Sequence, residues 1–276
     1  MNILITGGSG LIGRDLVAEL SKNNSLKIFS ISNTKKVENK NLNVTNIYHD
    51  LLQPITEEKT PKNINIIIHL AAIAHKFDSE TMTVNCLITK NIIDAFINKK
   101  VRFVFFSSVA VYGEANRKFP IRVSDVCKPY SNYGLGKLKD EKIISSSFKD
   151  FIILRLCPVI EGDDTDLLKR VYLPKTKIKY RSGYNRTYSF LSHRTIFKSI
   201  NNIINQNEIT NRIINLKDPS NYCESDILNK YLGKEVKIPC MISEPIFFIL
   251  NLFSFIPKIY KINCLLTKML KNNTYE

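Results

Sequence analysis

Three glycines near the start of the chain are spaced so that the backbone could hold a diphosphate. Gly7, Gly10 and Gly13 follow a short apolar run and precede a segment with helical periodicity. Glycine has no Cβ, so the chain can turn sharply there and bring its backbone N–H groups close to an anion. The positive end of the following helix would add to the attraction. The alternative is a turn that binds nothing, but the strand–glycine–helix context favours a diphosphate site.

A tyrosine and a lysine four residues apart could form the proton-transfer part of a redox site. Tyr133 and Lys137 lie in a segment of helical periodicity, where this spacing places both on one face. A neighbouring ammonium group favours the phenolate and lowers the pKa of a tyrosine, which could then exchange a proton with a sugar hydroxyl or ketone. A chain with 12 tyrosines contains such a pair by chance, so the assignment depends on its surroundings.

Those surroundings include two serines at the end of an apolar strand. A hydroxyl at Ser108, directly after Ser107, could hold a substrate oxygen between itself and the phenol of Tyr133. The alternative for an isolated serine pair is a cap at the end of a strand. The glycines, serines and tyrosine together therefore predict a dinucleotide site next to a proton donor.

The elements that would position these residues alternate between apolar strands and amphipathic helices. Strands that are apolar throughout indicate a parallel sheet covered on both faces, and such sheets bind ligands at the carboxyl ends of their strands. The predicted strands are Asn2–Thr6, Leu26–Ser32, Val44–His49, Ile64–Leu70, Val101–Ser107 and Phe151–Leu156, and the predicted helices are Leu11–Leu20, Thr81–Asn98 and Tyr133–Ser146.

The pattern becomes irregular after about Gly162. We expect a dinucleotide-binding domain at residues 1–162 and a smaller C-terminal substrate-binding lobe at residues 163–276. Within this lobe Phe197–Asn205 predicts a helix, and Arg212–Leu216 predicts a strand that could return to the sheet. The apolar and basic residues of Pro239–Leu270 predict packing within the lobe, and the alternative is that Pro245–Lys271 forms an interfacial helix at a membrane surface.

Composition limits the class of protein. The net charge of +15 is explained by a composition bias toward lysine, asparagine and isoleucine, typical of an AT-rich coding sequence. The alternatives are phosphate-bearing small molecules or anionic lipid, whereas the scattered basic residues do not predict binding to nucleic acid. Six cysteines lack metal-binding spacing, so we expect reduced thiols and no metal. No apolar run is long enough to span a bilayer and no signal sequence precedes the first strand, so we expect a cytoplasmic protein.

Taken together, these segments resemble the NAD-dependent epimerase/dehydratase family of extended short-chain dehydrogenases/reductases, which act on nucleotide sugars. The resemblance implies an α/β fold with a Rossmann-type doubly wound parallel sheet, and it weakens in the C-terminal third. The matching segments, in family order, are Thr6–Gly13, His69–Ala72, Val84–Asn85, Ser107–Gly113, Tyr133–Lys137 and Leu154–Arg155.

The resemblance also implies a set of site residues. The catalytic residues would be Ser108, Tyr133 and Lys137. The cofactor-binding residues would be Gly7, Gly10, Leu11, Ile12, Gly13, Ser32, Asn33, Lys35, Asp50, Leu51, Leu70, Ala71, Ala72, Asn85, Ser107, Tyr133, Lys137 and Pro158. The substrate-binding residues would be Ser108, Val109, Tyr133 and Arg186. Asp50 could instead be a loop residue, Asn85 a helix-surface residue and Arg186 a solvated surface residue.

Departures from the family pattern refine these expectations. Ser32 stands where NAD-preferring relatives carry an acid for the ribose 2′-hydroxyl, so the sequence favours NADP over NAD. Val109 and Ala110 follow Ser108 where dehydratases of the family carry an Asp-Glu pair, which argues against dehydration. Pro158 replaces an asparagine that many relatives place near the substrate diphosphate.

The expected activity is reduction of a 4-keto nucleotide sugar by hydride transfer, with Tyr133 as proton donor, in the synthesis of surface polysaccharide sugars. The alternatives are a C4 epimerase of nucleotide sugars that retains NAD, an epimerase of a lipid-linked sugar diphosphate, and a non-catalytic dinucleotide sensor. The family resemblance also implies a homodimer.

Overall fold

The computed structural model describes residues 1–33, 41–73, 78–113, 115, 118–160, 178–229 and 234–276. The chain divides into two compact units. Unit 1 comprises Met1–Ser108, Asn132–Arg155 and Phe197–Ile214, and unit 2 comprises Val109–Ser131, Leu156–Ile196 and Asn215–Glu276. The predicted domain boundary after residue 162 lies outside the described residues and stays a prediction.

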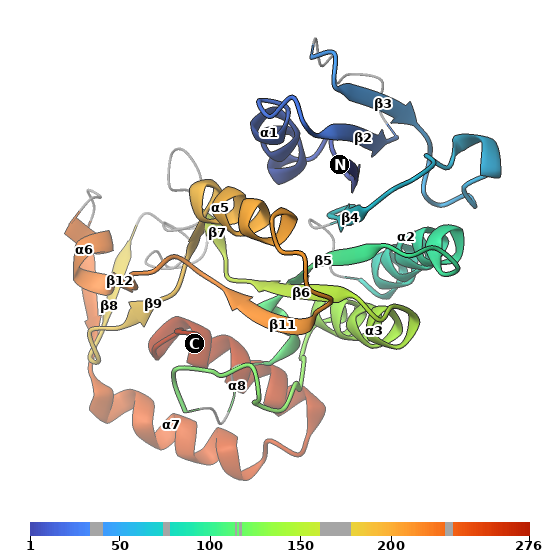
Figure 1. The fold of residues 1–276 in the computed structure, drawn as a ribbon. Coiled ribbons are helices and arrows are strands. Elements are labelled where there is room, and N and C mark those ends of the chain that lie inside the picture. Colours follow the sequence, from blue (N-terminus) through green and yellow to red (C-terminus); the bar gives the residue numbers. More distant parts are fainter. Residues whose placement is uncertain (34–40, 74–77, 114, 116–117, 161–177, 230–233) are drawn as a thin grey trace. The chain divides into compact units, whose positions relative to one another are not determined.

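A seven-stranded sheet forms the centre of unit 1 (Figure 1). Its strands are β1 (Asn2–Thr6), β2 (Lys27–Ser32), β3 (Val44–Tyr48), β4 (Ile66–His69), β5 (Arg102–Ser108), β6 (Phe151–Leu156) and β11 (Asn211–Leu216). They lie in the order β11-β6-β5-β4-β1-β2-β3, and the β1–β2, β2–β3, β1–β4 and β4–β5 pairs are parallel. The order therefore reverses between β1 and β4, which is where open α/β sheets bind ligands. The predicted Rossmann-type fold is confirmed.

Helices cover both faces of this sheet. Figure 1 shows α2 and α3 along one face and α1 and α5 along the other. The helical segments are α1 (Leu11–Leu20), the short 3₁₀ turn η1 (Glu57–Lys59), α2 (Ser79–Phe96), α3 (Asn132–Ser147) and α5 (His193–Ile204). Because both faces are covered, Ile3, Leu4 and Ile5 of β1 are all fully buried. This explains why the strands are apolar throughout.

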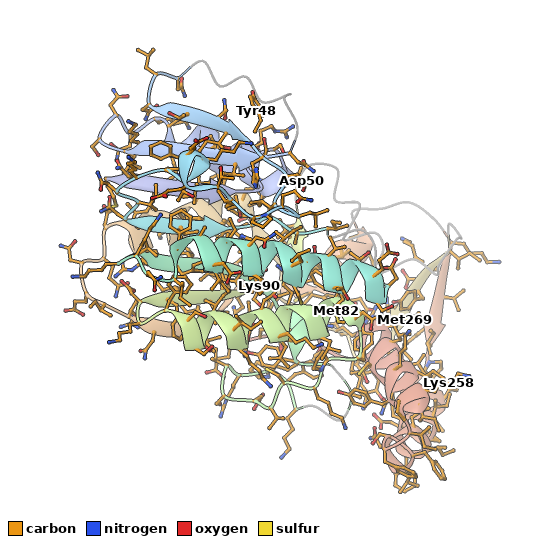
Figure 2. All side chains as sticks on the ribbon, turned by 90° about the vertical axis from the view of Figure 1, so that its right-hand side faces the viewer. Tyr48, Asp50, Met82, Lys90, Lys258 and Met269 are labelled. Carbon is orange, nitrogen blue, oxygen red and sulfur yellow. The ribbon has the colours of Figure 1, made fainter. Side chains whose placement is uncertain are left out.

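Helices α2 and α3 approach each other closely at a glycine. A Cβ on Gly136 would lie 3.0 Å from Cγ of Met82, which Figure 2 shows on α2 beside α3. Under the helices, Ile92, Phe96 and Phe103 belong to the main buried apolar cluster of unit 1. Packing against this cluster fixes the face that α2 and α3 present to the sheet.

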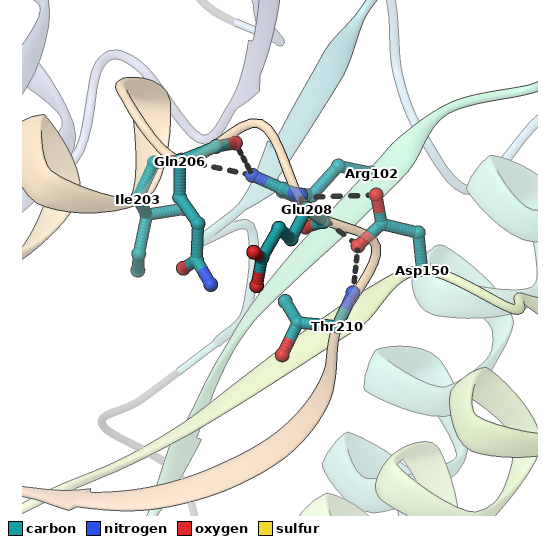
Figure 3. A network of polar contacts seen from close by, with 6 residues as sticks. All are labelled: Arg102, Asp150, Ile203, Gln206, Glu208 and Thr210. Carbon is teal, nitrogen blue, oxygen red and sulfur yellow. Dashed lines mark hydrogen bonds and ion pairs between the residues drawn. The ribbon is translucent and has the colours of Figure 1, made fainter.

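A polar network ties together the ends of three elements opposite the carboxyl ends of the strands (Figure 3). Nε of Arg102, the first residue of β5, donates to Oδ1 of Asp150 at 3.0 Å. Its Nη1 donates to the carbonyl of Ile203 at 3.0 Å, and its other guanidinium bonds reach the carbonyls of Gln206 and Glu208. Asp150 also accepts from the amide of Thr210 at 3.2 Å. The network thus joins β5, the start of β6 and the segment that leads into β11.

The described part of unit 2 consists of short strands paired over long sequence separations, together with helices and a 3₁₀ turn. Strand β10 pairs with β7, β9 with β12 and β8 with β13. The elements are η2 (Val109–Val111), β7 (Val159–Ile160), β8 (Lys179–Ser182), β9 (Thr187–Tyr188), β10 (Leu191–Ser192), β12 (Tyr222–Cys223), α6 (Glu224–Asn229), β13 (Glu235–Ile238), α7 (Cys240–Leu252) and α8 (Pro257–Leu270). Within the described parts of the chain, none of the helices is both long and apolar enough to cross a membrane.

Candidate active site

Unit 1 contains a cavity of about 210 Å³ at the carboxyl ends of β1, β2, β3 and β4. The predicted residues around it are Gly7, Gly10, Ser32, Asn33, Asp50, Leu51, Leu70, Ala71 and Ala72. Five further lining residues were not predicted from the sequence: Ser9, Ile31, His49, Ile73 and Ile88. The four loops that follow these strands come together because parallel strands end at one edge of the sheet.

The glycine turn forms one wall of the cavity and needs its glycines. Gly7 has a φ of +74°, and a Cβ there would lie 2.8 Å from the amide nitrogen of Ala71. A Cβ on Gly13 would lie 2.1 Å from the carbonyl oxygen of Gly7, so the first turn of α1 could not pack against the loop. Gly10 precedes α1 and provides no side-chain cap. The backbone amides of Leu11, Ile12 and Gly13 therefore begin a helix whose positive end suits a diphosphate.

Two asparagines of α2 hold the opposite wall in place. Oδ1 of Asn85 accepts from the amide of Ile73 at 2.7 Å, and its Nδ2 donates to the carbonyl of the same residue at 3.1 Å. Nδ2 of Asn91 donates to the carbonyl of Leu51 at 2.8 Å. Ile73 and Leu51 both line the cavity. Asn85 is thus a buried positioning residue rather than a residue of the helix surface, and Asn91 has the same role without having been predicted.

A buried polar chain runs beneath the cavity. Nδ1 of His69 lies 2.7 Å from the hydroxyl of Thr6, and its Nε2 lies 3.1 Å from the hydroxyl of Thr89. Thr89 also donates to Oδ2 of Asp140 at 3.1 Å. Burial, helped by the charge of Lys137, lowers the pKa of His69 to about 3, so its imidazole is neutral. The hydroxyl of Thr6 also accepts from the amide of Ala71 at 3.3 Å. These hydrogen-bonded side chains therefore help to fix the backbone of Ala71 at the cavity wall.

The predicted catalytic hydroxyls meet at the end of β5. The hydroxyl of Ser108 is hydrogen-bonded to the phenol of Tyr133 on α3. Burial raises the pKa of Tyr133 above its ordinary value, and the bond from Ser108 opposes that rise. The phenol is therefore protonated at neutral pH, which is the state that a proton donor needs.

Lys137 lies one helical turn after Tyr133 and is almost completely buried. Its Nζ donates to the carbonyl of Phe106 at 2.9 Å and lies 4.6 Å from the centre of the Phe105 ring. Burial lowers the pKa of Lys137 to about 8, against the opposing charges of Asp140 and the neighbouring Glu141. The ammonium group is thus held at the carboxyl end of β5.

A buried ion pair between Glu141 and Arg155 is hydrogen-bonded to this end of β5. The hydroxyl of Ser107 donates to Glu141, whose carboxylate is paired with Arg155 at 2.8 Å. All three side chains are buried. Ser107 therefore connects the strand to α3 and β6, while its predicted contact with the cofactor stays a prediction.

Three other predicted residues, Val109, Pro158 and Arg186, belong to unit 2. Lys35 lies outside the described residues. Val109 is buried in η2, and the carbonyl of Pro158 accepts from the amide of Leu191 at 3.0 Å. Arg186 is fully buried rather than solvated, with its guanidinium paired with Glu224 and its Nη1 without a partner among the described residues. A contact of Arg186 with substrate stays a prediction, and Nη1 is the atom that could make it.

The described residues contain no group of three or more histidine, cysteine, aspartate or glutamate side chains that could hold a metal ion.

Comparison with known proteins gives a family match over most of unit 1. The model of the NAD dependent epimerase/dehydratase family matches residues 3–166. The chain is 31% identical over 171 residues to D-erythronate dehydrogenase of Haemophilus influenzae, covering 56% of this chain and 54% of that protein. It is 28% identical over 163 residues to GDP-6-deoxy-D-talose 4-dehydrogenase of Aggregatibacter actinomycetemcomitans, covering 56% and 52%. The alignments thus span about half the length of these curated relatives.

Solved structures match over more of the chain. A UDP-glucuronic acid 4-epimerase from Bacillus cereus in complex with NAD superposes with a TM-score of 0.70, 21% identity and 87% coverage of both chains. A UDP-galactose 4-epimerase superposes with a TM-score of 0.68 and 16% identity, covering 100% of this chain and 89% of that one. At these identities the likeness establishes the fold.

Proposed function

The chain belongs to the NAD-dependent epimerase/dehydratase family, and from this premise we propose that it reduces the 4-keto group of a nucleotide sugar. The observation that carries the proposal is the hydrogen bond between Ser108 and a protonated Tyr133 at the end of β5. A carbonyl oxygen placed between the two hydroxyls would be held by Ser108 and would receive its proton from Tyr133.

The cavity of unit 1 fits a dinucleotide. The glycine turn leaves the amino terminus of α1 open for the diphosphate, with Gly7 and Gly10 at the cavity wall. Asp50 and Leu51 would face the adenine, and the segment Leu70–Ala72 would line the path to the nicotinamide. When bound, the nicotinamide supplies the hydride.

The end of β2 favours NADP in this proposal. Ser32 and Asn33 line the cavity where relatives that prefer NAD carry a carboxylate for the ribose. Without that negative charge a 2′-phosphate can be accommodated. The expectation that Lys35 adds a positive charge concerns a residue outside the described ranges.

The remaining groups prepare the proton transfer. The loss of a proton from Tyr133 leaves a phenolate, which the ammonium group of Lys137 one turn away would stabilise. Burial raises the pKa of Tyr133 and lowers that of Lys137 to about 8, so Lys137 loses its proton at a lower pH than Tyr133 does. The proposed substrate contacts besides Ser108 and Tyr133 are Val109 and Arg186.

A second candidate is a C4 epimerase that retains NAD. The putative UDP-glucose 4-epimerase of Methanocaldococcus jannaschii is 32% identical over 151 residues, covering 51% of this chain. The same Ser108–Tyr133 pair would serve an epimerase, because oxidation and reduction at one carbon use one proton relay in both directions. An epimerase of a lipid-linked sugar diphosphate or a non-catalytic dinucleotide sensor would differ in substrate or in turnover. A cytoplasmic homodimer stays a prediction.

Mass spectrometry of the cofactor released from freshly purified protein separates the two candidates. We expect an empty site and NADPH-dependent turnover of a 4-keto nucleotide sugar, whereas stoichiometric NAD would favour the epimerase. Tyr133→Phe should lower kcat by about a hundredfold or more, since positioned acid–base groups contribute that much. Tyr48→Phe, at an exposed tyrosine of the same unit, is the matched control. Equal activity of Tyr133→Phe and wild type would overturn the mechanism.

A further inference from the structure

Helices α7 and α8 form a hairpin in unit 2 that exposes a broad apolar face. Met241 is 88% exposed, Phe248 67% and Phe255 76%. The other exposed apolar residues of this face, hereafter the hairpin face, are Ile242, Ile246, Ile249, Leu252, Phe253 and Ile256. Globular proteins rarely leave so many large apolar side chains together in water without a partner.

The opposite side of the hairpin is firmly packed, so the exposure of the hairpin face does not come from poorly anchored helices. Nδ2 of Asn263 on α8 donates to Oδ1 of Asn251 on α7 at 2.7 Å. The phenol of Tyr260 donates to the carbonyl of Lys128 at 2.7 Å, and Sγ of Cys264 accepts from the amide of Ala115 at 3.3 Å. The hairpin is therefore fixed within unit 2 with one side inward and the other in solvent.

The chemistry of the hairpin face suits hydrocarbon better than another protein. The segment Pro245–Leu250 carries no side-chain hydrogen-bond donor or acceptor, whereas protein interfaces have about one hydrogen bond per 100–200 Å². Glu244 is the only charged residue from Cys240 to Ile256. Its carboxylate is engaged by the phenol of Tyr184 and by Lys271.

Lysines border the hairpin face. Lys258 and Lys261 are exposed in the first turns of α8, and Figure 2 shows Lys258 on that helix. Lys234 and Lys237 are exposed just before α7. An apolar face with aromatic residues and a basic margin is the pattern of helices that lie in a membrane interface, where the lysines contact anionic headgroups. The net charge of +15 would add attraction from a distance.

We propose that the hairpin face of α7 and α8 docks onto an anionic lipid bilayer. The 13 residues of α7 are too few to cross a bilayer, so the hairpin lies in the interface. The aromatic and aliphatic side chains enter the acyl boundary, and Lys258 and Lys261 remain at the headgroups. The hairpin face contains none of the residues proposed for the oxidoreductase site, and its test does not require activity.

Vesicle flotation tests the proposal with the full chain. Vesicles of phosphatidylcholine with roughly 30% phosphatidylglycerol should bind the protein at ~0.1 M salt, and vesicles of phosphatidylcholine alone should bind it less. Phe248→Ser with Phe255→Ser should weaken binding by about tenfold or more for each side chain. Lys258→Glu with Lys261→Glu should weaken it by about fivefold or more for each lysine. Val126→Ser, at a residue of unit 2 that is 77% exposed, is the matched apolar control and should leave binding unchanged.

The outcomes distinguish lipid from a second copy of the chain as the occupant. If Phe248→Ser with Phe255→Ser keeps the wild-type melting temperature and loses vesicle binding, the proposal is supported. If the wild type does not bind anionic vesicles, or if Phe248→Ser with Phe255→Ser binds them as well as Val126→Ser does, the proposal fails. Light scattering that shows a dimer of the wild type and a monomer of the variant, without vesicle binding, assigns the face to self-association and also overturns it.

Discussion

Buried polar side chains outside the cavity fix the positions of the elements that form the candidate site. His69, Thr89 and Asp140 connect β4, α2 and α3 below the cavity, and Asn85 fixes the backbone of Ile73 at its wall. Groups of this kind are costly to bury without partners, so each one fixes the position of its neighbours. The position of α3, which carries Tyr133 and Lys137, thus depends on buried polar side chains as well as on apolar packing.

The buried imidazole of His69 predicts a specific pH dependence of stability. Its pKa of about 3 in the folded protein lies below the ordinary value of 6.5, so the unfolded chain binds one more proton between these values. The free energy of unfolding therefore falls as pH decreases from 6.5 toward 3. His69→Gln removes this proton-binding site. As pH falls, the free energy of unfolding of the wild type should decrease by up to about 1.4 kcal/mol per pH unit more than that of the variant. Urea denaturation at several pH values measures both slopes, and parallel slopes would contradict the prediction.

Asn85→Ala tests the clamp on the cavity wall. The substitution removes two hydrogen bonds to the backbone of Ile73, which we expect to raise the dissociation constant of the dinucleotide by about tenfold. Isothermal titration measures this constant, and melting without ligand shows whether the variant is folded. Asn98→Ala, at an exposed position just after α2, serves as the control. A folded Asn85→Ala variant with wild-type affinity would show that the clamp does not matter.

The hydrogen-bond network around Arg102 takes the place of apolar packing at the amino-terminal end of β5. Its guanidinium is buried and satisfies three carbonyl groups, that of Ile203 at the end of α5 and those of Gln206 and Glu208 after it, together with the carboxylate of Asp150 (Figure 3). Removal of one partner from such a network leaves several buried polar groups without hydrogen bonds. The segment that leads from α5 to β11 therefore depends on one side chain.

Arg102→Met should lower the free energy of unfolding by about 3–5 kcal/mol, because Asp150 and the three carbonyls lose their donor in a buried place. Chemical denaturation measures the change. Arg122→Met is the matched control: its ion pair with Glu276 is exposed, with side chains 68% and 62% accessible, and surface pairs contribute about 0–1 kcal/mol. A loss below about 1 kcal/mol for Arg102→Met would mean that water satisfies the carbonyl groups in its place.

The sequence predicted the central strands of unit 1 well because strands such as β1 and β4 are apolar on both faces, a pattern that survives small errors in boundaries. It placed the start of α2 at Thr81, whereas the helix begins at Ser79 because the carboxylate of Asp78 accepts from the amide of Thr81 at 2.6 Å. It missed Asn91, since an asparagine on a helix shows no sign in the sequence that it will bond a backbone 40 residues away.

The two units differ in how far the sequence determines them. Unit 1 follows from local periodicity, and its cavity is lined by loops that directly follow predicted strands. The strands of unit 2 that the structure describes, such as β8 and β13, have only two to four residues each. Strands this short show no clear pattern in a sequence, and their partners are far away along the chain. The glycine turn, Ser108 and Tyr133 could therefore be predicted, whereas the buried position of Arg186 beside Glu224 could not.

The dinucleotide should stabilise the whole molecule, and the size of that effect reveals which dinucleotide it prefers. A ligand that binds only the folded chain at 100 times its dissociation constant adds about 2.7 kcal/mol to the free energy of unfolding. Because Ser32 lines the cavity without a carboxylate at the end of β2, we expect NADP to raise Tm more than NAD at equal concentration. Ser32→Asp should reverse this order, since a carboxylate would repel the 2′-phosphate and accept from the 2′-hydroxyl of NAD. Ser9→Asn keeps the charge of the cavity and is the control. A wild type that NAD stabilises more than NADP would refute the preference and favour the epimerase.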